Sequence, residues 1–289
     1  MLMVSRDRFD AHFIEDALET GHGNVQLFEG VDVRHVEETE TGVIVHTGNK
    51  QEPFYGKYLI AADGVLSPTA RSLGLNHPHS IGFAVDAEIH VTADVYEAEK
   101  NRATFNLFCV PSGYGWIFPK NGYLSCGVGS WRGKTNLMQH MQSFLAESFP
   151  DGSILSIKQY GHGVPVFPGY RQIATRRVCM VGDAAHLVDP IVGEGIQYAI
   201  KSGAIAAQVI QNLLQNPSGE PHFETRYIRD VRLSSEAVAA LFDTHRDCRV
   251  YQVLARRSIG FKLEITRLTG ELFFEDSQGF YQKFCNSVK

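Results

Sequence analysis

The sequence predicts a mixed α/β fold in which an antiparallel sheet is inserted between two α/β segments and a helical region follows. Three observations favour this fold. A buried strand, a glycine-rich turn and a long helix succeed one another over 177–214. Apolar and polar residues alternate through most of 80–169, as expected for antiparallel strands. The pattern after Pro217 is mostly helical.

The first segment predicts a helix and then short strands. Residues 5–21 have helical apolar spacing, with Ser5 as the N-cap and Gly21 near the end. Strands are predicted at 25–30, 33–39, 42–47 and 52–63, with hairpin turns at Thr41-Gly42 and Gly48-Asn49. Residues 58–62 are apolar on both faces, which is typical of a central strand.

The middle segment predicts strands at 81–91, 103–110, 113–119, 122–131 and 154–167, interrupted by one helix at 136–149. The last segment predicts a buried strand at 177–182 and a helix rich in small residues at 196–214. Helices are expected in the tail at 231–245, 248–257 and 261–273.

Composition excludes several classes of protein. The formal net charge is −5, which gives no reason to expect nucleic-acid binding. The 5 cysteines are far apart and form no C-x-x-C pair, so we expect reduced thiols. No metal-ligand spacing occurs among the histidines, and no metal is expected. No run approaches membrane-span length and the first residues do not resemble a signal peptide, so we expect a cytoplasmic protein.

The strongest motif follows the strand at 177–182. Gly182 ends this strand and allows a ligand to approach the backbone. Asp183 then lies at the carboxyl end of the strand, where ligands bind in open α/β sheets and where a carboxylate can accept bonds from sugar hydroxyls. Pro190 stiffens the loop, and Gly193 and Gly195 open the following helix, whose free N–H groups favour negative charge. The alternative is an ordinary strand–turn–helix unit with turn glycines.

Three motifs together carry a family resemblance. Val181 to Ile196 looks like the second FAD signature of the aromatic-hydroxylase-like flavoprotein superfamily. Asp63-Gly64 resembles its DG motif, and residues 4–10 resemble the V-x-R-x-x-F-D segment whose arginine reaches the FAD pyrophosphate. The resemblance implies FAD as cofactor, reduced by NAD(P)H or another donor. It implies FAD contacts at Arg6, Asp63, Gly64, Gly182, Asp183, Pro190, Gly193, Gly195 and Ile196.

A second run indicates the substrate. Tyr114, Trp116 and Phe118 share one face of a predicted strand, which Pro119 ends. With Gly127 and Gly129, this run is similar to the Y-x-W-x-F-P…G-x-G signature of geranylgeranyl reductases, which saturate isoprenoid chains. The resemblance implies an isoprenoid or prenylated lipid held on an aromatic wall, with the two glycines leaving room for a bulky ligand. The alternative is a plain aromatic core. Tyr114 is a candidate acid by position only.

The resemblance also implies the domain organisation. Residues 1–78 and 170–216 would be two parts of a partial FAD-binding, Rossmann-like domain, 79–169 an inserted antiparallel substrate domain, and 217–289 a helical tail. The G-x-G-x-x-G unit that opens such proteins is absent from residues 1–30. We therefore expect a missing front segment or a second chain that supplies it, and weak FAD binding by these 289 residues alone.

Three functions remain open from the sequence. The first is an FAD-dependent reductase of isoprenoid double bonds, by hydride transfer from reduced flavin. The second is a monooxygenase or halogenase of the same superfamily. The third is a degenerate, non-enzymatic lipid-binding fragment. An isoprenoid substrate would bring the protein to a membrane surface, and the basic segment 248–274 is a candidate for peripheral contact.

Overall fold

The structure is a computed structural model that describes residues 3–48, 52–75, 81–107, 109–131, 135–167, 172–189 and 193–215, together with the backbone of 261–266. The described residues fall into two compact units. The sheet unit lies within Met1–Gly30, Phe83–His162 and Leu254–Lys289. The strand–helix unit lies within Val31–Gly82 and Gly163–Val253.

The strand–helix unit contains two small sheets. An antiparallel sheet has the order β1-β2-β3, formed by β1 (Val33–Glu38), β2 (Val43–Thr47) and β3 (Phe54–Gly56). The predicted turn at Thr41-Gly42 joins its first two strands, and Thr39 N donates to Gly42 O at 2.9 Å. The second sheet pairs β4 (Leu59–Ala61) with β10 (Val178–Met180) in parallel. The two buried strands predicted at 58–62 and 177–182 are therefore neighbours.

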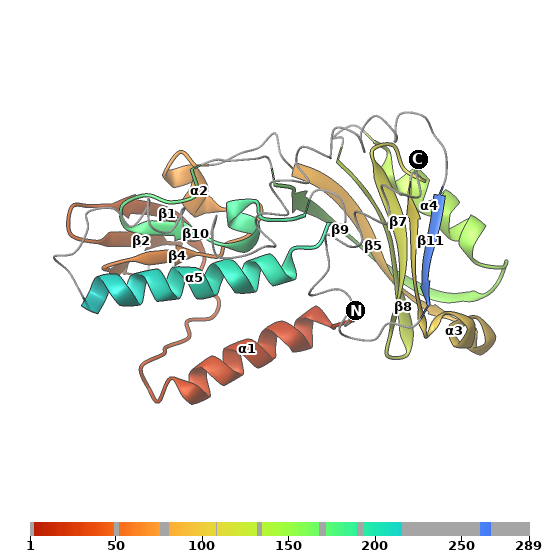
Figure 1. Ribbon diagram of the computed structural model, residues 1–289, viewed down its shortest axis with the longest axis horizontal. Coiled ribbons are helices and arrows are strands. Elements are labelled where there is room, and N and C mark those ends of the chain that lie inside the picture. Colours follow the sequence, from red (N-terminus) through yellow and green to blue (C-terminus); the bar gives the residue numbers. More distant parts are fainter. Residues whose placement is uncertain are drawn as a thin grey trace. The chain divides into compact units, whose positions relative to one another are not determined.

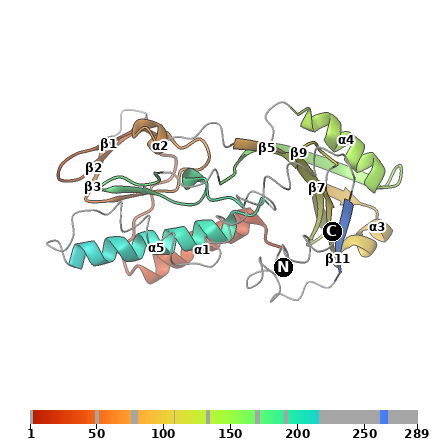
Figure 2. The same cartoon turned by 45° about the horizontal axis from the view of Figure 1, so that its top comes forward.

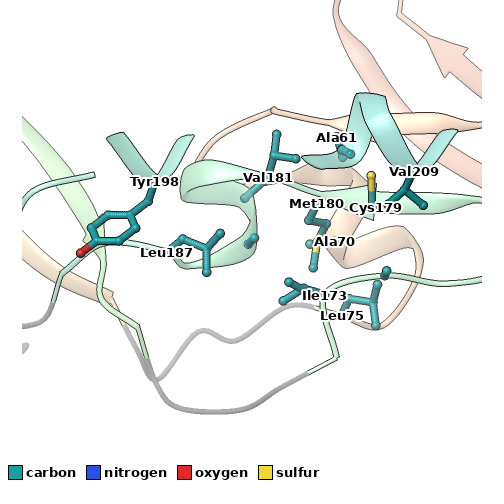
Figure 3. Packing of buried hydrophobic residues seen from close by; sticks show 14 of the residues in the cluster. Ala61, Ala70, Leu75, Ile173, Cys179, Met180, Val181, Leu187, Tyr198 and Val209 are labelled. Atoms are coloured by element: carbon teal, nitrogen blue, oxygen red, sulfur yellow. The ribbon is translucent and has the colours of Figure 1, made fainter. Parts of the chain in front are cut away.

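Helix α5 (Ile196–Gln215) covers this parallel pair (Figures 1 and 2). Its small and apolar residues face β4 and β10, and Ala206 and Val209 are almost fully buried. The core between them also takes in the short helix α2 (Pro68–Ser72) and the 3-10 turn η2 (Gly182–Ala185). Figure 3 shows Val181, Leu187 and Tyr198 in this core. The core fixes the carboxyl end of β10 against the beginning of α5.

The sheet unit is built on a sheet of six strands in the order β11-β6-β7-β8-β5-β9. These strands are β5 (Ile81–Val91), β6 (Arg102–Leu107), β7 (Gly113–Lys120), β8 (Tyr123–Ser130), β9 (Ile154–Pro165) and β11 (Phe261–Thr266). Adjacent strands from β11 to β5 pair antiparallel, as the alternation predicts. The unit boundaries at 82/83 and 162/163 fall inside β5 and β9, whereas we predicted boundaries at 78/79 and 169/170.

The two faces of this sheet differ. Helices α3 (Ala93–Glu99) and α4 (Leu137–Ser148) cover one face, where Phe144 and Met141 of α4 meet Ile117 of β7 in a buried apolar core (Figure 1). The other face carries alternate residues of the same strands, because neighbouring side chains in a strand point to opposite faces. A second aromatic cluster lies there, around Phe105 and Tyr114.

Some predicted elements are corrected by the structure. Residues 25–30 form no strand, and Val25, Leu27 and Phe28 are exposed. Helix α3 was not predicted, because two turns with few apolar anchors give a weak periodic signal.

The structure also differs from the prediction in the tail. Residues 261–266 form strand β11, which pairs with the edge strand β6, rather than part of a helix. The sequence Phe-Lys-Leu-Glu-Ile-Thr alternates with period two, which suits a strand that satisfies the free backbone groups of an edge. The remaining predicted tail helices lie outside the described residues.

Helix α1 (Arg6–Thr20) was predicted almost residue for residue, with Ser5 at its N-cap and Gly21 at its C-cap. None of its residues is buried, and Phe13 and Ile14 are each 47% exposed. Across the described part of the chain, no helix combines the length and the apolar character that crossing a membrane requires.

Candidate functional site

The turn after β10 is held in a conformation that only glycine adopts easily. Gly182 has φ +53°, and its N–H donates to Ser202 Oγ of α5 at 3.0 Å. A Cβ added at Gly182 would lie 2.9 Å from Ala199 Cβ. The chain therefore turns against α5 at very close range. This places Asp183, which is half-buried, at the carboxyl end of β10.

The beginning of α5 lies against the same turn. Gly193 has φ +68° and donates from its N–H to Asp189 O at 3.0 Å, while Asp189 N donates to Glu194 O at 2.8 Å. A Cβ added at Gly195 would lie 3.0 Å from Val188 Cγ2 and 3.4 Å from Asp183 Oδ1. The structure thus brings Gly182, Asp183, Gly193, Gly195 and Ile196 together. Pro190, predicted for the same loop, lies outside the described residues.

Glu194 is a member of this site that we did not predict. Its Oε1 accepts from Gln197 N at 2.9 Å and so occupies one free N–H of the first turn of α5. Its Oε2 is buried and has no hydrogen-bond partner within the described ranges. Burial raises the pKa of the Glu194 carboxyl above the usual range, and the bonds from Gln197 oppose this only in part. The signal in the sequence was a carboxylate between Gly193 and Gly195, to which we had assigned no role.

Asp63 and Gly64 follow β4, the parallel neighbour of β10. Gly64 has φ +77°, and the exposed Asp63 accepts at Oδ2 from Thr69 N at 3.0 Å. The buried Ser67 caps α2 by accepting from Ala70 N at 2.8 Å. Asp63 therefore has a structural task, namely holding the first turn of α2, beside any contact with a ligand.

Arg6 belongs to the sheet unit, unlike the other predicted cofactor residues. It is the first residue of α1, and its Nη2 lies 2.7 Å from Asp10 Oδ2 in an exposed ion pair one helical turn away. Its predicted role with a pyrophosphate stays a prediction.

The three aromatic residues of β7 form one continuous wall, defined here as Tyr114, Trp116 and Phe118. The ring centroids of Tyr114 and Trp116 are 5.8 Å apart, and those of Trp116 and Phe118 are 6.2 Å apart in a stacked arrangement. Phe105 of β6 packs edge-on to Phe118 at 5.0 Å. Pro119, which we also predicted here, points to the opposite, helix-covered face because it alternates with Phe118.

Access differs along this wall. Tyr114 is buried, whereas Trp116 and Phe118 are half-buried. The N-terminal segment approaches the same cluster, since Met3 packs against it and Lys120 Nζ donates to Val4 O at 2.7 Å. The half-buried rings of Trp116 and Phe118 are therefore the part of the wall that a ligand can reach.

The structure gives a different explanation for Gly127 of β8 from the one we expected. Gly127 lies directly opposite Trp116, and a Cβ added at Gly127 would come to 2.1 Å from Trp116 Cζ2. The indole of Trp116 itself fills the space that we expected to be left for a ligand. At Gly129 the added Cβ would meet Trp116 Cζ3 and Ala84 Cβ at 3.7 Å, which is ordinary contact. Gly127 is thus explained by packing within the wall.

Comparison with known proteins shows which family this chain resembles. The family described as the FAD binding domain matches residues 1–226. A digeranylgeranylglycerophospholipid reductase of Methanocella arvoryzae is 32% identical over 183 residues, which cover 61% of this chain and 46% of that protein.

Two solved structures share the fold. The crystal structure of a geranylgeranyl bacteriochlorophyll reductase-like protein from Thermoplasma acidophilum aligns with TM-score 0.70 and 24% identity, covering 88% of this chain and 67% of that one. CmlS, a flavin-dependent halogenase, aligns with TM-score 0.65 and 18% identity, covering 99% of this chain and 52% of that one. The chain spans about half the length of the curated relatives it matches.

Proposed function

This chain belongs to the FAD binding domain family, and from that premise we propose that it works in an FAD-dependent reductase that saturates double bonds of isoprenoid lipids. The observation that carries the substrate class is the wall of Tyr114, Trp116 and Phe118, on the face of the six-stranded sheet opposite α3 and α4. The likeness to a halogenase, at 18% identity, shows the fold alone and does not favour halogenation.

The residues present fit FAD. Gly195 lets the beginning of α5 lie close to Val188 and to the carboxylate of Asp183, because a Cβ there would come to 3.0 Å from Val188 Cγ2 and 3.4 Å from Asp183 Oδ1. In this proposal Asp183 accepts hydrogen bonds from hydroxyl groups of the cofactor. Gly193, Gly195 and Ile196 present the first turn of α5, whose N–H groups stabilise negative charge. Asp63, Gly64 and Gly182 let the backbone approach the cofactor, and Arg6 pairs with its phosphates.

When bound and reduced, FAD supplies a hydride to the double bond. The task of the protein is then to hold an apolar chain still and to exclude water. The rings of Trp116 and Phe118 offer a broad apolar surface for this, because aromatic side chains bury large areas with few rotatable bonds. Tyr114 is buried at one end of the wall, which favours a packing role over the acid role predicted by position.

The first test concerns the cofactor. The purified chain is titrated with FAD and followed by flavin absorbance, beside the variants Asp183→Asn and Asp151→Asn. We expect Asp183→Asn to weaken FAD binding by about tenfold to hundredfold, because a hydrogen bond to a charged group contributes about 1.5–3 kcal/mol. Asp151 is an exposed turn residue of the sheet unit and serves as the matched control. Equal affinities for the two variants would contradict the assignment of Asp183.

The second test concerns the reaction. The FAD-loaded chain is reduced chemically and incubated with a geranylgeranyl lipid in detergent micelles, and the lipid is analysed by mass spectrometry. We expect hydrogen to be added across its double bonds, and Trp116→Ala to weaken lipid binding more than Trp131→Ala does. A lipid that emerges unchanged from an FAD-saturated protein would refute the proposed function.

Peripheral contact with a lipid surface completes the proposal. An isoprenoid lipid must be taken from a bilayer, and basic residues are interleaved with apolar ones over 248–274. Apart from the backbone of 261–266, this segment lies outside the described residues. Co-sedimentation with anionic and neutral vesicles tests the idea, and equal binding to both would contradict a basic contact.

A further inference from the structure

A carboxyl group lies beside the aromatic wall. Asp86 of β5 pairs across the sheet with Gly127 of β8, and Gly127 pairs with Trp116 of β7. Directly opposed residues in antiparallel strands point to the same face, so Asp86 shares with the wall the face opposite α3 and α4. The indole of Trp116 lies over Gly127 and fills the space between the two strands on that face. Figure 1 shows β5, β8 and β7 side by side.

Asp86 accepts hydrogen bonds from neutral groups, the side chain of Ser125 and the backbone of Ala87. Ser125 Oγ, which is buried on β8, donates to Asp86 Oδ1 at 3.0 Å. In the described part of the chain no cation lies within ion-pair distance of this carboxyl. An aspartate that is half-buried without an ion pair is uncommon, because burial of a lone charge is costly.

The surroundings of Asp86 make its carboxyl hold a proton more tightly than a free aspartate does. Burial raises the pKa of the Asp86 carboxyl. The hydrogen bonds from Ser125 and from the Ala87 backbone, and the charges of the exposed His162 of β9 and of Lys120 of β7, lower it by less. Lys120 is itself half-buried and donates to Val4 O. On β5, Glu88 also faces this side and is contacted by Tyr160 of β9, whose OH donates to Glu88 Oε2 at 3.4 Å.

We propose that Asp86 is the proton donor in the reduction, so that this inference rests on the proposed function. Saturating a double bond adds one hydride and one proton to its two carbons. The O–H bond of the Asp86 carboxyl breaks and a C–H bond forms at one carbon, while the hydride goes to the other. The two electrons come with the hydride, and the carboxylate left on Asp86 regains its proton from water.

Asp86 is better suited to this task than Tyr114. A carboxylic acid gives up a proton far more readily than a phenol, whose pKa is about 10. A donor also has to reach the substrate. Asp86 is half-buried on the face that carries the accessible rings, whereas Tyr114 is packed among Phe105, Trp116 and Trp131.

The experiment compares Asp86→Asn with Glu88→Gln, two isosteric changes on the same face of β5. With the FAD-loaded, reduced chain and a geranylgeranyl lipid, we expect Asp86→Asn to lower the rate of double-bond reduction by about 10²–10⁴-fold, the usual contribution of a general acid. Lipid affinity should be unchanged, and Glu88→Gln should keep the rate. Asp86→Glu, which restores an acid, should recover part of it.

A flavin-independent readout accompanies the rates. The chain has 2 tryptophans, so Trp131→Phe leaves Trp116 as the sole emitter. We expect its emission to change with pH as Asp86 titrates, and this step to vanish with Asp86→Asn but persist with Glu88→Gln. Absence of the step in a folded protein overturns the proposal even where a variant fails to fold.

The outcomes separate the two hypotheses. An Asp86→Asn enzyme as fast as wild type overturns the proton-donor role and leaves the reductase intact. If Asp86→Asn loses lipid affinity as well as rate, Asp86 is a binding group, and the proton-donor role is again overturned. A wild-type protein that binds FAD and lipid but reduces nothing refutes the proposed function, and the role of Asp86 falls with it.

Discussion

The two units both depend on closely packed glycines, but for different reasons. In the strand–helix unit, Gly182 is required by its own backbone, which has positive φ and turns against α5. In the sheet unit, Gly127 has an ordinary strand conformation and is required by the indole of Trp116. The first kind of glycine shapes the chain at the proposed cofactor site, whereas the second makes room for a side chain of the protein itself. A Gly-x-Gly pattern therefore does not by itself indicate ligand binding.

The largest effect is expected at Gly182. Gly182→Ala should lower the free energy of unfolding by about 3 kcal/mol, because a side chain at positive φ costs about 1–2 kcal/mol and overpacking costs about 1–3 kcal/mol. Urea denaturation measures the change. The matched control is Gly203→Ala in α5, where an added Cβ meets nothing within 4 Å. There we expect a gain of about 0.5–1 kcal/mol from helix propensity. Similar losses at both positions would erase the distinction drawn for Gly182.

Gly127 should respond less strongly, since a ring can move more easily than a backbone. We expect Gly127→Ala to cost about 1–3 kcal/mol by overpacking and to shift the emission of Trp116. Gly161→Ala in β9 is the control, because an added Cβ there meets nothing within 4 Å. The double variant Gly127→Ala, Trp116→Leu identifies the cause. If Gly127→Ala costs much less stability in the Trp116→Leu background than in wild type, the indole is the cause. An equal cost in both backgrounds would point to the backbone instead.

Glu194 gives the strand–helix unit a pH dependence. Its folded-state pKa is raised by burial, so the folded protein binds the proton more tightly than the unfolded chain does. Stability from this group is therefore present below the unfolded pKa and is lost as pH rises through the folded pKa, by at most about 1.4 kcal/mol per pH unit for one proton. Chemical denaturation from pH 4 upward should show a steeper loss of stability with pH in wild type than in Glu194→Gln, where only the remaining groups such as Asp86 contribute. An identical slope in both proteins would exclude Glu194 as its source.

Arg6 should have the smallest effect on stability. Its ion pair with Asp10 is exposed, so Arg6→Ala should cost only about 0.3–0.5 kcal/mol. The same variant sharpens the comparison of the units, because Arg6 is the one predicted cofactor residue in the sheet unit. A loss of FAD affinity without a loss of stability would support a phosphate contact, and unchanged affinity would confine the cofactor residues to the strand–helix unit.

Local sequence signals predicted much of the fold. The spacing of Phe9, Phe13, Ile14 and Leu18 predicted α1, and the alternation in 113–131 predicted the hairpin of β7 and β8. These signals are strong because each depends only on the spacing of apolar residues within one segment, with a period of 3.6 residues in a helix and 2 in a strand. Residues 25–30 had strand-like composition but no partner strand, and they form a loop.

For the candidate site, the sequence by itself determined the order of the glycines, carboxylates and aromatic residues within each segment. That order was enough for the turn at Gly182 and Asp183, the beginning of α5 and the wall on β7, since each is local to one segment. Only the tertiary structure decided that Trp116 fills the space at Gly127, that Glu194 has a buried oxygen, and that Asp86 lies across the sheet from the wall. The contact of Trp116 with Gly127 depends on the register of β7 against β8, and the position of Asp86 depends on the pairing of β5 with β8. The burial of Glu194 depends on packing around the beginning of α5, and none of these is specified by one segment alone.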